Sequence, residues 1–293
     1  MQKRKAIIFG NCQAAAVATI LGAHDEFRDQ FEIVPVRSVH ALTMPERERL
    51  LVEAQEADLL IHQPVSNVYQ PASTENLLAA VNPEAPIISF PVCWFDGYFP
   101  DMVQLKTNGA KAESILFPYH SRVMFYAYLA GLKTGDAAAI YNAPKLYTEA
   151  FLHENVAKNL RNLRTRETDL DIKIADFIEQ HYRYKRLFFT FNHPTGHVLF
   201  FIVDDILRRL NLSPFGPEAK RKFGSLLGRH RWQDSPSVVR ELQLQFSQAS
   251  TFLARQERLS AVAFAEHYFR SYDDNPALVS ANTSLPRNGL QLV

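Results

Sequence analysis

The residue best suited to chemistry in this sequence is Cys12, which stands between an apolar run, Ala6–Phe9, and an alanine-rich run, Ala14–Leu21. The first run predicts a short buried strand and the second predicts a helix. Gly10 and Asn11 allow the tight turn between them. The thiol is therefore expected near a helix N-terminus, where free backbone N–H groups and the helix dipole favour an anion. Such a position lowers a thiol pKa from about 8.5 to roughly 3.5–7.5 and makes the sulfur a nucleophile.

This strand-to-helix turn resembles a nucleophile elbow, although an elbow usually carries a serine between glycines. Its backbone N–H groups are placed to hold a developing oxyanion. Side-chain amides supply further candidate contacts to an oxyanion or a substrate, at Asn11, Gln13, Gln63 and Asn192. The alternative is that Cys12 is a small apolar residue packed beneath the sheet, as free cysteines often are. We interpret Cys93, which lies in an apolar run before Trp94, as packing.

A nucleophilic thiol needs a base within hydrogen-bond reach, and that base is usually a histidine. Of the ten histidines, His193 is the preferred candidate, because it follows a β-like run, Leu187–Phe191. It also precedes Pro194, which suits the first turn of a helix, so it occupies the same kind of junction as Cys12. The alternative is that Asn192 caps the helix and His193 is an ordinary polar residue. Weaker candidates are His62 and His197 for the base, and Asp96 and Asp101 for a carboxylate that orients it.

Composition excludes several classes of protein. The chain has 293 residues, 47% of them hydrophobic, and a formal net charge of +1, so no global field points to nucleic acid or a membrane surface. Its two cysteines argue against a disulfide framework, and no Cys/His cluster or HExxH predicts a metal site. Apolar stretches such as Val198–Val203 are too short to span a bilayer. Because only Ala6–Phe9 is apolar after Lys3, a secretion signal is not predicted, and we expect a cytoplasmic protein.

The first hundred residues alternate strand and helix patterns, which predicts a parallel sheet with helices on its faces. Ligands bind beyond the C-terminal ends of the strands in such sheets. Three segments fall there together: 10–13, 62–66 and 91–97. The predicted strands are Ala6–Phe9, Phe31–Val36, Ala57–Ile61 and Pro86–Phe90, and the predicted helices are Ala14–Leu21, Pro45–Ala57 and Thr74–Val81.

After about residue 115 the pattern becomes mainly helical, so helix is expected to exceed strand over the chain. The predicted helices there are Tyr119–Leu132, Lys145–Leu163, Asp169–Arg183, Thr195–Leu210 and Ser235–Ala254. We therefore predict a Rossmann-like α/β fold, with an N-terminal parallel sheet and flanking helices. Its expected parts are a nucleophile-bearing α/β part (1–115), a mainly helical part with the candidate histidine (116–275) and an extended tail (276–293).

At 10–13 (GNCQ), 62–64 (HQP) and 192–195 (NHPT), the sequence resembles the WcbI-type polysaccharide biosynthesis enzymes, from residue 5 to about 270. The resemblance implies an acetyltransferase of bacterial capsule assembly that uses coenzyme A as acyl carrier. It implies that Cys12 and His193 are the working pair, that acetyl-CoA is the donor, and that a sugar hydroxyl is the acceptor. In the capsule enzymes the implied acceptor is a heptose unit.

The GNCQ tetrad also looks like a variant of the Gly-Asp-Ser block of SGNH hydrolases, with cysteine in place of serine. That wider family uses an Asp-x-x-His pair near its C-terminus. Here Thr190 stands three residues before His193, so the group that orients the histidine is undefined. A Cys-His dyad, or a triad closed by a backbone carbonyl or a distant aspartate, fits this pattern.

Coenzyme A carries phosphates, so a local basic cluster is expected even on a nearly neutral protein. The densest cluster is 229–231 with 220–222, and 119–122 is a second option at a helix start that suits phosphate. The alternative for each cluster is a solvated surface. The candidate cofactor contacts are Gly10, His120, Arg122, Arg229 and Arg231.

The leading hypothesis is a coenzyme A-dependent O-acetyltransferase that acts on a carbohydrate, through an acetyl-Cys12 thioester or by direct transfer. The enzyme alternative is a cysteine-dependent esterase or thioesterase, which uses the same site with water as the acceptor. The non-enzyme alternative is a nucleotide- or glycan-binding protein whose turn only holds a phosphate. No GxGxxG or GxxxxGKS loop supports the usual nucleotide-binding modes.

Overall fold

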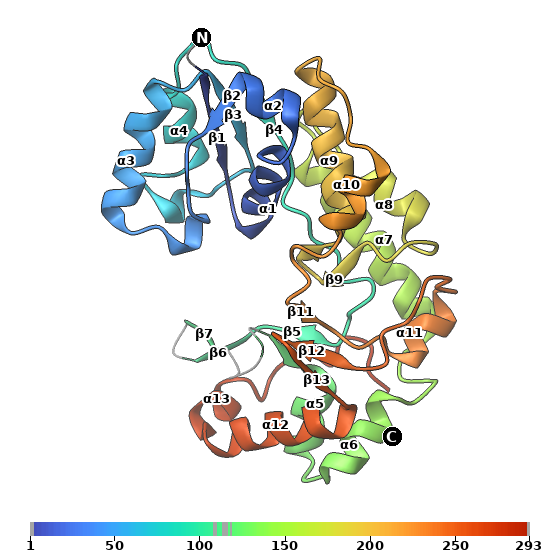
Figure 1. The fold of residues 1–293 in the computed structure, drawn as a ribbon. Helices are drawn as coiled ribbons and strands as arrows, with labels where there is room; N and C mark the ends of the chain where they lie inside the picture. Colours follow the sequence, from blue (N-terminus) through green and yellow to red (C-terminus); the bar gives the residue numbers. More distant parts are fainter. Residues whose placement is uncertain (1–2, 108–109, 113–116, 118, 292–293) are drawn as a thin grey trace. The chain divides into compact units, whose positions relative to one another are not determined.

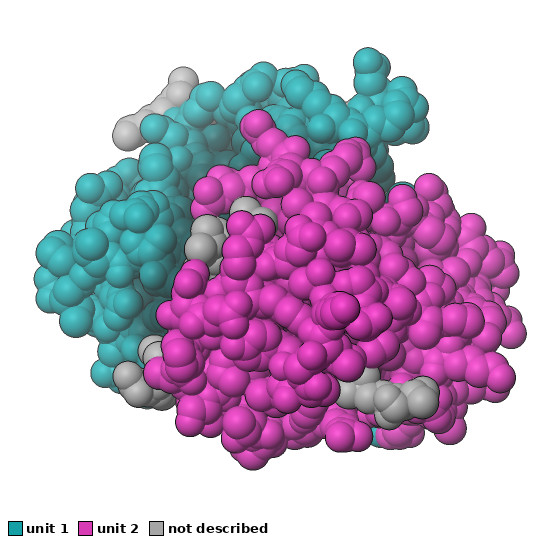
Figure 2. All heavy atoms as spheres, turned by 90° about the horizontal axis from the view of Figure 1, so that it is seen from below, with its two compact units in different colours: residues 1–94, 160–180, 193–227 teal, residues 95–159, 181–192, 228–293 magenta. Residues whose placement is uncertain are grey.

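The computed structural model describes residues 3–107, 110–112, 117 and 119–291. The chain forms two compact units, each built from segments that are separate in sequence (Figure 2). The first unit comprises Met1–Trp94, Leu160–Gln180 and His193–Leu227, and the second comprises Phe95–Asn159, His181–Asn192 and Gly228–Val293. The predicted boundary at 115/116 lies outside the described residues.

The first unit contains a four-stranded parallel sheet, which confirms the predicted α/β class. Its strands are β1 (Arg4–Phe9), β2 (Phe31–Ile33), β3 (Leu59–His62) and β4 (Ile87–Ser89), in the order β2-β1-β3-β4. In register, Phe9 lies beside His62, and His62 lies beside Ser89. The strand order reverses between β1 and β3, because β2 lies on one side of β1 and β3 on the other. Parallel sheets bind ligands at such a switch point, beyond the C-terminal strand ends.

Helices cover both faces of this sheet (Figure 1). Ile7, Phe9 and Leu60 share a buried cluster with Leu50 of α3 (Met44–Gln55) and Leu77 of α4 (Thr74–Ala80). On the other face, α1 (Cys12–Leu21) packs against α9 (Gly196–Arg209). The remaining elements of this unit are α2 (Asp25–Gln30), η1 (Val39–Ala41), η2 (Asn67–Tyr69), β10 (His193–Pro194) and α10 (Pro217–Lys222). Residues of both units form α7 (Glu149–Arg166) and α8 (Ala175–His181).

The second unit packs helices beside a three-stranded antiparallel sheet, with Trp232, Phe252 and Phe264 fully buried in its aromatic core. The sheet has the order β11 (His230–Arg231), β12 (Phe252–Ala254), β13 (Glu257–Leu259). The helices are α5 (Arg122–Leu129), α6 (Thr134–Tyr141), α11 (Pro236–Glu241), α12 (Ala261–Asp273) and α13 (Pro276–Ala281). The other strands are β5 (Met102–Val103), β6 (Leu105–Thr107), β7 (Ala110–Ala112), β8 (His120–Ser121) and β9 (Phe188–Thr190).

The structure differs from the sequence expectation in two segments of the second unit. The helix predicted over Ser235–Ala254 ends at Glu241, and Gln243 takes a φ of 53°, which an α-helix cannot contain. The end of that segment is strand β12, in which Phe252 and Ala254 are buried on one face. The predicted extended tail begins with a short helix, α13, which has a proline in its first turn and buries Leu278.

Candidate functional site

Cys12 is the first residue of α1 and follows β1 by three positions. The preceding Asn11 caps the helix, because its Oδ1 accepts a hydrogen bond from the backbone N–H of Gln13 at 2.8 Å. This cap explains why the helix begins at Cys12 rather than at Ala14, where the alanine-rich pattern begins. The half-buried thiol therefore lies at the C-terminal edge of the sheet, beside the β1/β3 switch point.

The pKa of the Cys12 thiol is raised above its ordinary value of 9.0, chiefly because the group is withdrawn from water. The backbone N–H groups of Cys12 and Gln13 act in the opposite direction, as the helix N-terminus predicts, but they do not outweigh burial. This reverses the direction that the sequence pattern indicates. The resting thiol is therefore mainly protonated at neutral pH, and a nucleophilic role would require a base that removes the proton.

Two buried glutamine side chains bind the loops around Cys12 to one another. The Gln63 Oε1 accepts from the backbone N–H of Asn11 at 3.1 Å. The Gln63 Nε2 donates to Gln13 Oε1 at 2.9 Å and to the carbonyl of Pro91 at 3.1 Å. Gln13 forms two further bonds with the backbone of Cys93: its Oε1 accepts from the N–H and its Nε2 donates to the carbonyl, each at 2.8 Å.

These bonds revise the role expected for the two amides. Both N–H bonds of Gln63 are donated within the protein and its oxygen already accepts one, so its donors are saturated. Gln13 is likewise fully buried and bonded to Gln63 and Cys93. Instead of contacting an oxyanion, Gln13 and Gln63 hold three strand-end loops at fixed positions around the thiol. The amide N–H of Asn11 is also used, since it is bonded to Gln63.

Position 10 requires a glycine, because the backbone there lies close to the side chain of Gln63. A Cβ atom at position 10 would lie 2.6 Å from Gln63 Oε1 and 3.0 Å from the Cβ of Ala14. Its carbonyl accepts from the backbone N–H of Val39 at 2.9 Å. The expected contact of Gly10 with a cofactor stays a prediction, whereas its steric role in seating Gln63 follows from these distances.

His193 lies at the same end of a helix pair as Cys12. The C-terminal ends of α1 and α9 lie close together. His24 follows α1 by three residues and Ser213 follows α9 by four, and the ring Nε2 of His24 lies 2.9 Å from the carbonyl of Ser213. The N–H of Ser213 also donates to Glu26 at 3.1 Å. Since α1 and α9 pack side by side and end together, they run parallel and begin at the same edge (Figure 1). His193 precedes α9 by three residues, as part of β10, and is half-buried.

His62 is buried at the end of β3, with its Nδ1 3.2 Å from the carbonyl of Gln63. Burial lowers the pKa of this histidine, and the charge of Asp171 acts against that shift. Asp171 accepts from the N–H of Ser89 at 2.8 Å and from its hydroxyl at 2.7 Å. This carboxylate was not among the residues predicted from the sequence, because it lies inside the predicted helix 169–183, whereas α8 begins only at Ala175.

Other predicted residues belong to the second unit. The Asn192 Oδ1 accepts from the hydroxyls of Tyr119 at 2.6 Å and Thr190 at 3.1 Å. His120 is fully buried, with its Nδ1 3.3 Å from the Tyr272 hydroxyl and its ring stacked on Tyr272, so it is a core residue rather than an accessible cofactor contact.

The guanidinium of Arg122 is also largely withdrawn from solvent, and its expected phosphate contact stays a prediction. Its Nε and Nη1 are buried, and burial lowers the pKa of the side chain. The two candidate orienting carboxylates have structural bonds: Asp96 accepts from Asn155 and Asn159, and Asp101 accepts from the N–H of Val123. Arg229 is exposed and Arg231 is half-buried on β11.

Cys93 has the packing role predicted for it. The side chain is fully buried, and burial raises the pKa of its thiol far above the usual range. Its Sγ lies 3.8 Å from the carbonyl of Pro91. Cys93 therefore contributes to the site through its backbone, which Gln13 binds, and not through its sulfur.

A family model described as "polysaccharide biosynthesis enzyme WcbI" matches residues 5–215 of the chain. The chain belongs to this family. A solved structure of WcbI, described as a novel polysaccharide biosynthesis enzyme, superposes with a TM-score of 0.79 at 21% identity, over 96% of this chain and 93% of that one. That structure is described as a native form without a disulfide bond between coenzyme A and a cysteine of that protein. A search of the curated proteins found no match.

Two further structural findings concern the part of the chain that the structure describes. No helix there is both long enough and apolar enough to cross a membrane. The same residues include no group of three or more His, Cys, Asp or Glu side chains that could hold a metal ion.

The Gln63→Ala substitution tests the amide pair. It leaves the N–H of Asn11 and the carbonyl of Pro91 without their partner, and each buried unsatisfied group costs about 1–3 kcal/mol. We expect the free energy of unfolding to fall by about 3 kcal/mol, because of these groups and Gln13, when it is measured by urea denaturation. The control is Gln55→Ala at the exposed end of α3, which should change it by less than about 0.5 kcal/mol. Equal effects of the two substitutions would contradict the role assigned to Gln63.

The Gly10→Ala substitution tests the close approach to Gln63. The new methyl group overlaps Gln63 Oε1, so the variant should unfold at lower urea concentration. In the Gln63→Ala background the added cost should be smaller, with a coupling energy of about 0.5–3 kcal/mol in a double-mutant cycle. Strictly additive effects would mean that the two residues do not act on each other.

The pH dependence of alkylation tests the state of the Cys12 thiol. Because its pKa is raised in the folded state, iodoacetamide should react more slowly at pH 7 than with the urea-unfolded chain, and the rate should keep rising above pH 9.0. By linkage, the associated stability is present below the ordinary pKa and is lost as pH rises through the raised one. Intact mass should show one adduct on the folded protein, since Cys93 is fully buried. A rate plateau below pH 7 would instead show a lowered pKa.

Proposed function

We propose that the protein is a coenzyme A-dependent O-acetyltransferase that moves an acetyl group from acetyl-CoA to a sugar hydroxyl during assembly of a bacterial capsular polysaccharide. The observation that carries the proposal is the position of Cys12 at the start of α1 and at the β1/β3 switch point, with His193 at the same end of the α1/α9 pair. Membership of a family of polysaccharide biosynthesis enzymes supports a carbohydrate acceptor.

The WcbI structure is described by the absence of a disulfide bond between coenzyme A and a cysteine. That description pairs coenzyme A with a cysteine, which supports the choice of coenzyme A as acyl carrier. A thiol carrier and a cysteine suit one another chemically, because transfer of acetyl between them exchanges one thioester for another. The proposed donor, acetyl-CoA, places the reaction in the cytoplasm. The acceptor implied by the family resemblance is a heptose-containing capsule precursor.

In the proposed first step, His193 accepts the proton of the Cys12 thiol, which burial keeps protonated at rest. The Cys12 sulfur attacks the carbonyl carbon of the donor thioester, and the backbone N–H of Cys12 at the helix N-terminus faces the developing oxyanion. As the tetrahedral species collapses, His193 returns the proton to the sulfur of the leaving coenzyme A. Cys12 then carries the acetyl group as a thioester.

In the second step, His193 removes the proton of the sugar hydroxyl, whose oxygen attacks the carbonyl carbon of acetyl-Cys12. The bond between carbon and the Cys12 sulfur breaks, and the sulfur takes the proton from His193. One acetyl ester of the sugar is formed and the site is regenerated. In the alternative, direct transfer, His193 activates the sugar hydroxyl and Cys12 only positions the donor. Ping-pong kinetics distinguish the first route from the second.

The test is titration of acetyl-CoA and coenzyme A into the protein by calorimetry, followed by intact mass after mixing. The wild-type protein should bind both and gain one acetyl group, and Cys12→Ala should bind without gaining it. His193→Gln should form the adduct about 10²- to 10⁴-fold more slowly, the usual contribution of a general base. The control is His197→Gln, which changes an exposed histidine on the first turn of α9.

Binding without an adduct, together with transfer to a sugar, would support direct transfer over the covalent route. Release of acetate in the absence of any sugar would instead support the esterase alternative. Failure of the folded protein to bind either acetyl-CoA or coenzyme A would overturn the proposal.

A further inference from the structure

The three-stranded sheet of the second unit places two arginines on one face. In its register, Arg231 of β11 lies opposite Leu253 of β12, and Leu253 lies opposite Arg258 of β13. Residues opposite one another project from the same face of a sheet. With strands about 4.8 Å apart, the two arginines stand about 10 Å apart at their backbones, on either side of Leu253.

This row borders a pocket of about 410 Å³. Its walls are Arg186, Arg231, Arg258, the segment 247–251 and Leu253. Arg186 is neutralised, because its Nη1 and Nη2 both donate to the carboxylate of Asp234, which also accepts from the N–H of Ala249. Asp234 is almost fully buried, so this ion pair fixes one wall of the pocket and leaves no carboxylate oxygen facing outward.

The other two arginines are not neutralised within the described part of the chain. There, Arg231 has no carboxylate within ion-pair distance; its Nε donates to the carbonyl of Gly228 at 3.2 Å and its guanidinium lies over the ring of Phe189. Arg258 has neither a hydrogen bond nor an ion pair with any of those residues. Burial lowers the pKa of Arg231, and the charges of Arg186 and Arg258 lower it further. The pocket therefore holds about two positive charges that lack a counter-ion among those residues.

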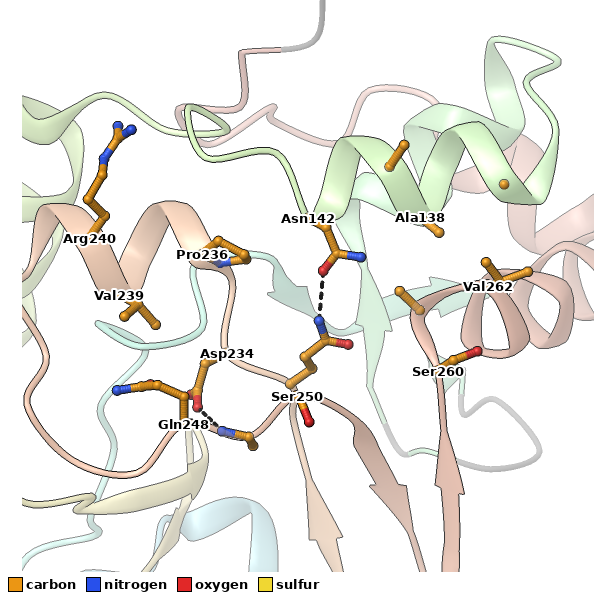
Figure 3. A pocket seen from close by; sticks show the side chains of 15 residues that line it. Ala138, Asn142, Asp234, Pro236, Val239, Arg240, Gln248, Ser250, Ser260 and Val262 are labelled. Atoms are coloured by element: carbon orange, nitrogen blue, oxygen red, sulfur yellow. Dashed lines mark hydrogen bonds between the residues drawn. The ribbon is translucent and has the colours of Figure 1, made fainter.

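A larger groove of about 770 Å³ adjoins this pocket and shares the segment 248–250 with it (Figure 3). Its wall is mainly apolar, formed by Ala138 of α6, Pro236 and Val239 of α11, and Val262 of α12. The Oδ1 of Asn142 accepts a hydrogen bond from Nε2 of Gln233 at 2.8 Å, which Figure 3 marks with a dashed line.

One polar atom in this groove lacks a partner. Gln233, which also lines the groove, is 6% exposed, and its Oε1 is buried with no hydrogen-bond partner among the described residues. A buried carbonyl oxygen in this state is costly unless a ligand or water donates to it. The groove thus offers a mainly apolar wall with Gln233 and Asn142 as polar residues on its lining, which suits an uncharged ring.

We propose that the second unit binds a phosphate-bearing ligand, with the phosphate between Arg231 and Arg258 and an uncharged ring body in the adjoining groove. Guanidinium groups match phosphate oxygens in geometry, and a diphosphate supplies two charges for the two arginines, which a single carboxylate does not. The ligand is either coenzyme A or a phosphorylated carbohydrate. In both cases the inference deepens the proposed function, on which it rests, by assigning a place to the acyl carrier or by naming the class of the acceptor.

The test uses calorimetric titration of two probes, uridine diphosphate and coenzyme A, at low ionic strength. Arg231→Gln and Arg258→Gln should each weaken binding of the phosphate-bearing ligand at least about tenfold, because each removes a charge-assisted hydrogen bond. The matched control is Arg255→Gln in the same hairpin, which removes an equal charge outside the pocket. Val262→Trp fills the groove at an exposed position. It should weaken binding of either probe, which has a ring body, but leave binding of inorganic pyrophosphate, which has none, unchanged.

The pattern of losses identifies the ligand. Loss of uridine diphosphate with unchanged coenzyme A supports a phosphorylated acceptor, and loss of coenzyme A alone assigns the pocket to the acyl carrier. If no probe binds, or if Arg255→Gln weakens binding as much as Arg258→Gln, the site is overturned. These outcomes are separate from the proposed chemistry, because Cys12→Ala should keep the pocket intact, and acetylation of Cys12 is read independently by mass.

Discussion

The paired amides of Gln13 and Gln63 are the interaction on which the rest of the site depends. Their hydrogen bonds connect the loops that follow β1, β3 and β4, so buried polar contacts hold the surroundings of the thiol in place. Such a network is useful only when every member is bonded, because a partly satisfied amide in a low-dielectric interior is costly. Gly10 is part of the same arrangement, because a side chain at this position would overlap the amide of Gln63.

Much of the first unit could be predicted from sequence, because its strands are short, apolar and separated by helices of clear period. The position of Cys12 at a strand-to-helix turn followed from the local pattern of residues 6–21. The direction of its pKa did not, because burial depends on which distant segments cover the turn. The structural role of Gln63 was not predictable either, because a glutamine that follows a strand has the same sequence pattern whether its amide contacts a substrate or another amide.

The second unit was harder to predict, for two physical reasons. Apolar spacing alone could not show that Phe252 belongs to a strand, because a short buried run fits either helix or strand. Charge density along the chain also proved a poor guide to accessible charge. Of the 119–122 cluster, His120 is stacked in the aromatic core. The arginines that share one face, Arg231 and Arg258, are brought together only by strand pairing.

The half-buried, protonated state of the Cys12 thiol has a consequence for how its sulfur meets oxidants. Peroxides and disulfides react with thiolates, and a thiol held in its neutral form is a poor target for them. At rest, the raised pKa of Cys12 therefore slows oxidation of its sulfur. The sulfur reacts faster with oxidants once a base has removed its proton.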